Sequence, residues 1–219
     1  MTMSALTNTM PTFSTAKTSD SLPLSEGRLH RAGLGVFFRP GQLEDLGIGG
    51  GHLRSLVAAG TVERIARGLY HLTDAEPTEH HSLAAVCARV PRSIVCLLSA
   101  LQVHGIGTRL SPEVWLAIPH KARAPRVPGI RVRLLRFSGA SWNYGVGDIE
   151  FEGVPARITN PARTVVDCFR FERLVGREAA MEALRDALRQ KLVTTDALFR
   201  TLEVVRSSRL HAVLEAMAP

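Results

Sequence analysis

The chain has 219 residues, which is more than one typical domain and less than two large ones, and 45% of them are hydrophobic. This composition predicts a folded, soluble protein and excludes a wholly disordered chain, while the net charge of +7 favours an anionic partner. Arg, His, Pro or Gly interrupts every apolar stretch before it reaches the length of a membrane span, so we expect a cytoplasmic protein without membrane segments.

The positive charge is unevenly distributed along the chain. Residues 78–147 carry 9 Lys or Arg against 2 Asp or Glu, whereas residues 1–77 carry 7 of each kind and residues 148–219 carry 11 of each. Cys87, Cys96 and Cys168 stand far apart in apolar sequence, which favours reduced core thiols over disulfides. We therefore expect neither a metal site nor a cofactor.

Composition divides the chain into three segments. Residues 1–24 are rich in Ser and Thr and lack the features of a secretory signal, so a disordered tail is expected there. A small module is expected over residues 25–77 and a larger one over residues 78–219. The predicted fold class is α+β: an N-terminal winged helix-turn-helix, then a mixed α/β domain with a small sheet and an all-helical C-terminal cap.

The small module has the spacing of a helix-turn-helix. Ser25-Glu26 indicates a first helix, and the apolar residues 36–38 indicate an extended segment after it. Pro40 suits the first turn of a short helix, and the glycines of residues 47–51 predict a tight turn into the next helix.

The second of these helices and the ribbon after it form a candidate DNA-reading surface. The helical spacing predicts that three side chains face the core: Leu53, Leu56 and Val57. A recognition helix contacts base edges in the major groove, and a basic hairpin beside it contacts phosphate. The candidates for base contact are His52, Arg54 and Ser55. The candidates for phosphate contact are Arg64 and Arg67, in two short β-type runs that break at Gly68.

Two other interpretations of this module stay open. Many small winged modules bind only proteins, in which case Arg64 and Arg67 are solvated hairpin charges. A glycine-rich phosphate loop at residues 47–51 is disfavoured, because the polar residues 42–45 stand where such a loop needs a buried strand.

Residues 78–219 alternate between helical and extended patterns. A helix is predicted over residues 79–90, and residues 94–104 are predicted to be helical from Ser99 onward. Strands are predicted over residues 114–118, 130–137, 149–152 and 156–158. Asn160-Pro161 is typical of a helix start, and apolar stripes predict helices from there to the C-terminus.

A second candidate surface lies in the basic middle segment. It comprises Lys121, Arg123, Arg126, Arg131, Arg133 and Arg136. These side chains would face a shared polyanion such as DNA, RNA or a nucleotide. A solvated strand and loop explains the same residues equally well.

Several runs together resemble the AbiEi-type antitoxins of type IV toxin–antitoxin systems, from about Val36 to the C-terminus. They are RIARGLYHL, VPRSIVCLLSALQVHGI, VWLAIP, IRVRLLRFSG, IEFEGVPARITNPARTVVDCFRF and EALRDALRQKLV. The resemblance implies a non-enzymatic protein with two separate roles. Its winged helix would repress its own operon by binding operator DNA, and its C-terminal domain would counteract a cognate nucleotidyltransferase-like toxin, AbiEii. The polyanion at the basic middle segment would then be either DNA beside the operator or the nucleotide or RNA on which the toxin acts.

Two alternatives remain. One is a ligand-responsive winged-helix transcription factor without a toxin partner. The other is a winged-helix nuclease, because Asp148, Glu150 and Glu152 alternate along a predicted strand, although no lysine follows at the usual spacing. His80-His81 and His104 are expected to be structural, and Arg163 and Asp167 are expected to pair along one helix.

Overall fold

The structure is a computed structural model that describes residues 34, 36–73, 75 and 78–217. The predicted tail and the helix predicted from Ser25 lie outside the described residues. Within them, no helix combines the length and the apolar character needed to cross a membrane.

The N-terminal module combines two short helices with a small sheet. Its elements are β1 (Phe37–Phe38), α2 (Pro40–Asp45), α3 (Gly50–Ala58), β2 (Val62–Ala66) and β3 (Leu69–Leu72). The strands form an antiparallel sheet in the order β1-β3-β2, and Gly68 turns the β2–β3 ribbon with a left-handed φ of 69°. The two helices after Pro40 and the ribbon are therefore present as predicted.

A five-stranded mixed sheet forms the centre of the molecule. Its strands are β4 (Ile94–Val95), β5 (Val114–Pro119), β6 (Val132–Phe137), β7 (Val146–Phe151) and β8 (Val154–Thr159), in the order β6-β5-β4-β8-β7. Pairing is parallel between β5 and β6 and between β4 and β8, and antiparallel elsewhere. The predicted mixed α/β domain with a small sheet is thus confirmed.

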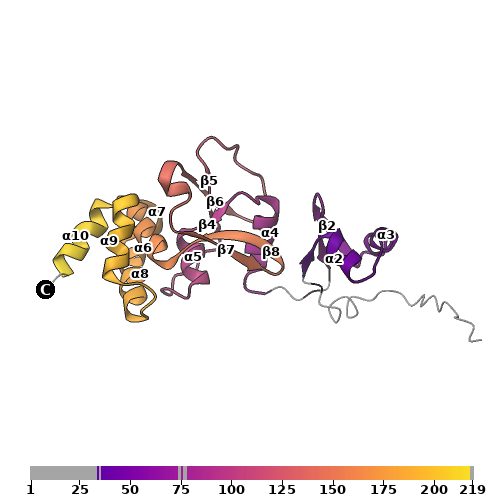
Figure 1. Ribbon diagram of the computed structural model, residues 1–219, viewed down its shortest axis with the longest axis horizontal. Coiled ribbons are helices and arrows are strands. Elements are labelled where there is room, and N and C mark those ends of the chain that lie inside the picture. The colour runs from indigo at the N-terminus through magenta and orange to yellow at the C-terminus, as the bar shows by residue number, and fades with distance from the viewer. Residues whose placement is uncertain (1–33, 35, 74, 76–77, 218–219) are drawn as a thin grey trace, which may run out of the picture.

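Helices cover both faces of this sheet. They are α4 (His81–Arg89) and α5 (Leu97–Val103), then α6 (Pro161–Arg170), α7 (Glu172–Val175), α8 (Arg177–Arg189), α9 (Thr195–Val204) and α10 (Ser208–Met217). A short 3-10 turn, η1 (Gly139–Trp142), follows β6. Figure 1 shows the N-terminal module at one end of the long axis and the helices α6 to α10 at the other.

Strand alternation divides the core between the two sheet faces. On β5, Trp115 and Ala117 join α5, α6 and the C-terminal helices, whereas Val114 and Leu116 join α4 and part of the N-terminal module. The apolar run that predicted a buried strand therefore packs on both sides.

Two predictions for residues 94–104 and 160–163 have different outcomes. The segment 94–104 begins as strand β4, and its helix starts at Leu97 rather than at Ser99. The polar Ser99 is buried within that helix, where its hydroxyl accepts a bond from Trp115 N at 2.9 Å. The cap is confirmed, because Asn160 Oδ1 accepts a hydrogen bond from Arg163 N at 2.9 Å.

Adjacent phenylalanines on β1 connect the N-terminal module to the central sheet. Phe38 packs into the module's own core, while Phe37 packs with α4 and the β7–β8 hairpin. Phe37 N also donates to Glu152 O at 3.2 Å. A side chain at Gly153 would place its Cβ 2.7 Å from Phe37 O, so this close approach requires glycine.

Candidate nucleic-acid interface

The helix α3 presents a polar face to solvent. Leu53 and Leu56 are buried, whereas His52, Arg54 and Ser55 are exposed. Ser55 Oγ donates to Gly51 O at 3.4 Å, one turn back along the helix. The predicted base-contacting residues are therefore all accessible to a ligand.

The prediction for one residue of the apolar stripe on α3, Val57, was wrong. The spacing predicted that it faces the core, but its side chain is 39% exposed. The core of the N-terminal module is small, and from α3 it takes only Leu53 and Leu56 as buried residues. A third apolar side chain on this helix therefore lies outside that core. The exposed face of α3 is consequently wider than the sequence predicted.

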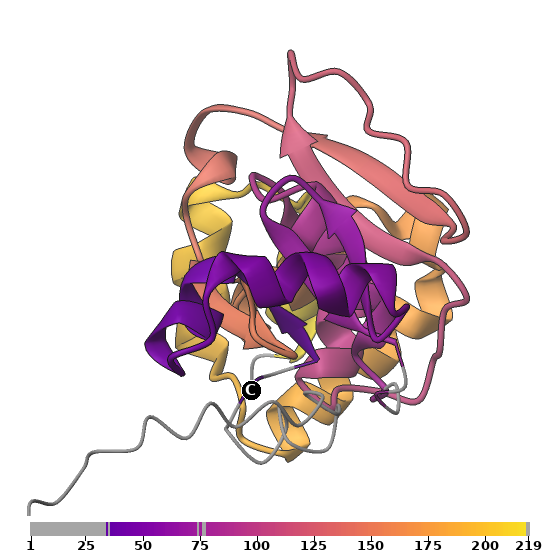
Figure 2. The same cartoon turned by 90° about the vertical axis from the view of Figure 1, so that its right-hand side faces the viewer.

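The β2–β3 ribbon lies beside this helix. β2 packs against α3, and Arg64 and Arg67 on the ribbon are exposed. Figure 2 shows α3 and the ribbon together at the end of the molecule that faces the viewer. The guanidinium groups of Arg54, Arg64 and Arg67 form no ion pair with any described residue.

A polar cluster around the buried Glu152 carboxylate connects the ribbon to the second module. The Glu152 side chain is 4% exposed and accepts bonds from Thr78 N and Thr78 Oγ1, while His81 Nδ1 lies 3.0 Å from its other oxygen. His71 on β3 stacks at an angle against Phe37 and edge-on to His81. Desolvation, followed by the charge of His81, lowers the pKa of His71.

Sequence reasoning did not identify this cluster, because its members come from distant positions. Glu152 and Gly153 both have positive φ, at 50° and 85°, which is the geometry of a two-residue hairpin turn between β7 and β8. A Glu-Gly pair between two alternating runs was the available signal for the turn. Nothing local indicated that its carboxylate reaches Thr78 and His81.

The prediction that three carboxylates alternate along one strand was wrong for Glu152. Asp148 and Glu150 lie exposed on β7. Glu152 belongs to the turn after β7, and its carboxylate oxygens already contact Thr78 and His81. The apolar partners on the strand, Ile149 and Phe151, pack with the core, as an amphipathic strand requires. Among the described residues no three His, Cys, Asp or Glu side chains converge on a shared metal position.

The basic residues of the middle segment fall into two groups, those that bind other residues of this chain and those that do not. Arg133 Nε donates to Glu113 Oε2 at 2.9 Å and its guanidinium lies over Trp115. Arg136 Nη1 donates to the carbonyl oxygens of His120 and Ala122, which closes the loop after β5. The exposed remainder, without such contacts to described residues, is Lys121, Arg123, Arg126 and Arg131.

Other titratable residues have structural roles. His104 Nε2 donates to Thr159 O at 2.7 Å, and the ring of His80 packs edge-on against Phe151. The three cysteines are free and buried, as predicted, and burial raises the pKa of each thiol.

Arg163 and Asp167 form the predicted pair along α6, and both side chains are fully buried. Arg163 Nε donates to Asp167 Oδ2 at 2.8 Å, and its other nitrogens donate to the carbonyl oxygens of Tyr144 and Ser141. Burial raises the pKa of Asp167 to about 6, against the opposing effect of Arg163. The pair attaches the segment between β6 and β7 to α6.

The N-terminal module matches a known protein family. Residues 28–73 match the profile of a family described as transcriptional regulators, AbiEi antitoxin. These residues contain α2, α3 and the ribbon, so the predicted resemblance is confirmed for the module that carries the candidate DNA-reading face. The description is that of regulators and antitoxins of toxin–antitoxin systems and not of an enzyme family.

A comparison with solved structures matched one protein from a mycobacterium. The RV2827C protein from Mycobacterium tuberculosis aligns with a TM-score of 0.49 and 17% identity, over 81% of this chain and 69% of its own. A search of curated proteins gave no significant match.

Proposed function

We propose that this protein is a DNA-binding transcriptional regulator that represses its own operon and serves as the antitoxin of a toxin–antitoxin pair. The observation that carries the proposal is the exposed polar face of α3, within the module that matches the AbiEi regulator family. The DNA-reading residues are His52, Arg54 and Ser55 on α3 and Arg64 and Arg67 on the ribbon. The N-terminal module, residues 25–77, would act as the winged helix-turn-helix.

The physical basis is the width of a major groove, which admits one α-helix. Arg54 and His52 would supply donors to base edges, and the ribbon arginines would contact phosphates on either side. Phe37 packs against α4 and the β7–β8 hairpin, and its amide donates to Glu152 O, so this attachment would hold the reading face in one orientation. A rigid reading face loses less entropy on binding than a mobile one.

Footprinting of the promoter upstream of this gene tests the regulator role. The full-length protein is expected to protect a discrete sequence, and His52→Ala/Arg54→Ala/Ser55→Ala together are expected to abolish the protection. Arg200→Ala, an exposed arginine paired with Asp196 on α9, is the matched control and should protect normally. Unchanged protection by the triple variant would overturn the assignment of α3.

The antitoxin role concerns residues 78–219, which would counteract a nucleotidyltransferase-like toxin encoded beside this gene. Co-expression with the adjacent gene tests it: the full-length chain is expected to restore growth, and the α3 triple variant is expected to restore it equally. A failure of the full-length chain to protect cells would leave a regulator without a toxin partner. The footprint result and the growth result are therefore independent.

A further inference from the structure

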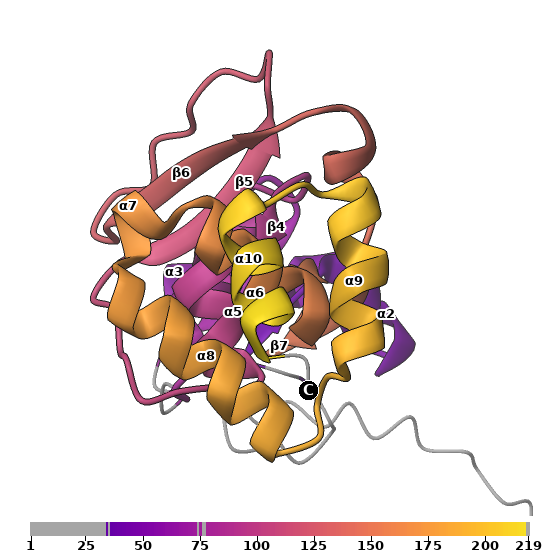
Figure 3. The same ribbon diagram turned by 90° about the vertical axis from the view of Figure 1, so that its left-hand side faces the viewer.

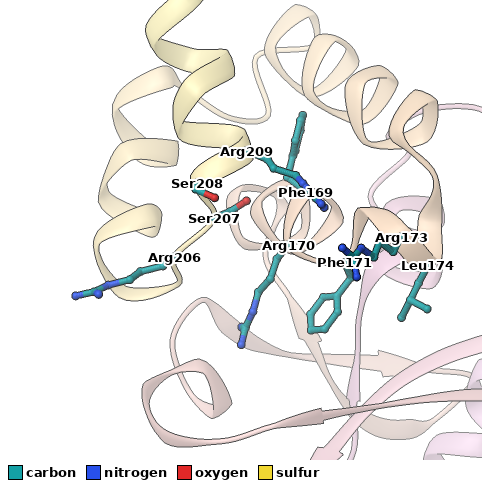
Figure 4. A pocket seen from close by; sticks show the side chains of 9 residues that line it. All are labelled: Phe169, Arg170, Phe171, Arg173, Leu174, Arg206, Ser207, Ser208 and Arg209. Atoms are coloured by element: carbon teal, nitrogen blue, oxygen red, sulfur yellow. The ribbon is translucent and has the colours of Figure 1, made fainter.

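A cavity at the C-terminal end of the molecule collects positive charge from separate segments. It measures about 560 Å³ and lies where the end of α6, α7 and the start of α10 meet (Figure 4). Its lining includes four arginines: Arg170, Arg173, Arg206 and Arg209. Figure 4 shows Arg173 and Arg209 extending toward the middle of the cavity, whereas Arg206 points outward.

Nearby carboxylates neutralise little of this charge. Arg209 Nε is 3.9 Å from Glu172 Oε2, and Arg170 Nη1 is 3.9 Å from Asp167 Oδ1, both at the outer limit of an ion pair. Asp167 already receives a 2.8 Å bond from Arg163. Arg173 and Arg206 have no ion pair with the described part of the chain, so the cavity keeps an excess of positive charge.

We propose that this cavity binds the polyphosphate chain of a nucleotide. Guanidinium groups bind phosphate oxygens through paired hydrogen bonds, and two of them, those of Arg173 and Arg209, extend into the cavity from separate helices (Figure 4). The cavity volume lies within the range of small-molecule sites, roughly 300 to 1,000 Å³. A concave site of this kind favours a compact anion over duplex DNA, whose phosphates follow an extended surface.

The lining indicates recognition of phosphate and not of a base. The ring of Phe171 stacks on Phe137 at 6.1 Å between centroids, and the guanidinium of Arg170 lies over the same ring. Because both contacts already occupy this ring, little aromatic surface remains for a base. Serine hydroxyls at Ser207 and Ser208, where α10 begins, add polar partners beside the arginines.

This site is separate from the proposed DNA interface. Figure 3 shows α9 and α10 at the end of the molecule that faces away from the N-terminal module. Variants of the cavity are therefore expected to leave promoter protection intact, and the inference goes beyond the proposed regulator function. Counting charges along the sequence did not reveal this cavity, because residues 148–219 have no net charge and the arginines come from different elements.

Calorimetric titration of the full-length protein with ATP at constant ionic strength tests the proposal. We expect saturable binding that sodium tripolyphosphate displaces, equal binding of GTP, and no binding of adenosine. Arg173→Gln/Arg209→Gln is expected to weaken ATP binding at least about tenfold. The control Arg200→Gln removes one exposed positive charge outside the cavity and should change the affinity less than about twofold.

Thermal unfolding of both variants without ligand identifies a loss of folding, and a single Arg173→Gln variant replaces the double variant if it unfolds. The proposal is overturned by an absence of ATP binding to the folded wild-type protein, or by folded cavity variants that bind ATP as the wild type does. It is also overturned if a single-stranded oligonucleotide binds in an arginine-dependent manner while ATP does not.

Discussion

Arg54 and Arg163 illustrate how one residue type serves two purposes in this chain. Arg54 lies exposed on α3 in a module with equal numbers of positive and negative charges, and it forms no ion pair with a described residue. Arg163 is fully buried on α6, where Asp167 and two carbonyl oxygens take up its donors. Net charge along the sequence therefore does not locate a binding surface; the contacts that each arginine already makes do.

The largest expected effect comes from breaking the buried pair. Arg163→Met should lower the free energy of unfolding by about 3 to 5 kcal/mol, because it leaves Asp167 buried without its partner. Chemical denaturation measures the change. Arg200→Ala breaks the exposed pair with Asp196 and should cost less than about 1 kcal/mol. Equal losses for the two variants would contradict the distinction between structural and exposed arginines.

A smaller loss is expected at the junction between the modules. Gly153→Ala should destabilise the protein by roughly 2 to 3 kcal/mol, since its φ is 85° and its Cβ would meet Phe37 O at 2.7 Å. The amide of Phe37, which donates to Glu152 O, should then exchange with solvent faster. Gly129→Ala is the matched control: its φ is 75° but nothing lies within 4 Å, so only about 1 kcal/mol is expected.

The basic middle segment should respond differently at its two kinds of arginine. Arg136→Ala should lower stability by about 1 kcal/mol, because the carbonyl oxygens of His120 and Ala122 lose their donor. Arg123→Ala/Arg126→Ala should leave stability unchanged and, if this surface contacts DNA, weaken promoter binding without altering sequence preference. Promoter affinity that is independent of Arg123 and Arg126 would assign them to a solvated loop.

The smallest effect concerns pH. The pKa of His71 is lowered in the folded protein, so the unfolded chain binds more protons as the pH falls through the usual range near 6.5. Stability should therefore decrease below that pH and be fully present above it. His81, Glu63 and Glu152 also face His71, so His71→Gln should reduce this dependence without removing it. Thermal unfolding between pH 5.5 and 7.5 measures the difference.

Periodicity and turn residues were sufficient to predict most elements of the fold. Pro40, the glycines before α3 and Asn160-Pro161 each act locally, and the structure has helices at all three places. Local patterns could not predict that Leu97 begins α5 after a two-residue strand, because that strand exists only by pairing with β5 and β8. The side-chain partners of Glu152 could not be predicted for the same reason, because they are distant in the sequence.

The candidate site was predictable in part for the same reason. Helical spacing placed His52, Arg54 and Ser55 outward, and the structure has them exposed. It failed at Val57, since exposure there depends on how far the small module's core extends. The four-arginine cavity was beyond sequence reasoning, because its lining is assembled from α6, α7, α10 and the segment before α10.

The salt dependence of promoter binding tests the reading face most directly. Fluorescence anisotropy over a salt series is expected to show that Arg64→Ala/Arg67→Ala lowers the slope of log affinity against log salt by about 2 and keeps the sequence preference. Arg54→Ala should instead reduce the preference for the promoter over unrelated DNA by about 1 to 3 kcal/mol. Slopes and preferences identical to those of the wild type in both variants would contradict a DNA interface formed by α3 and its ribbon.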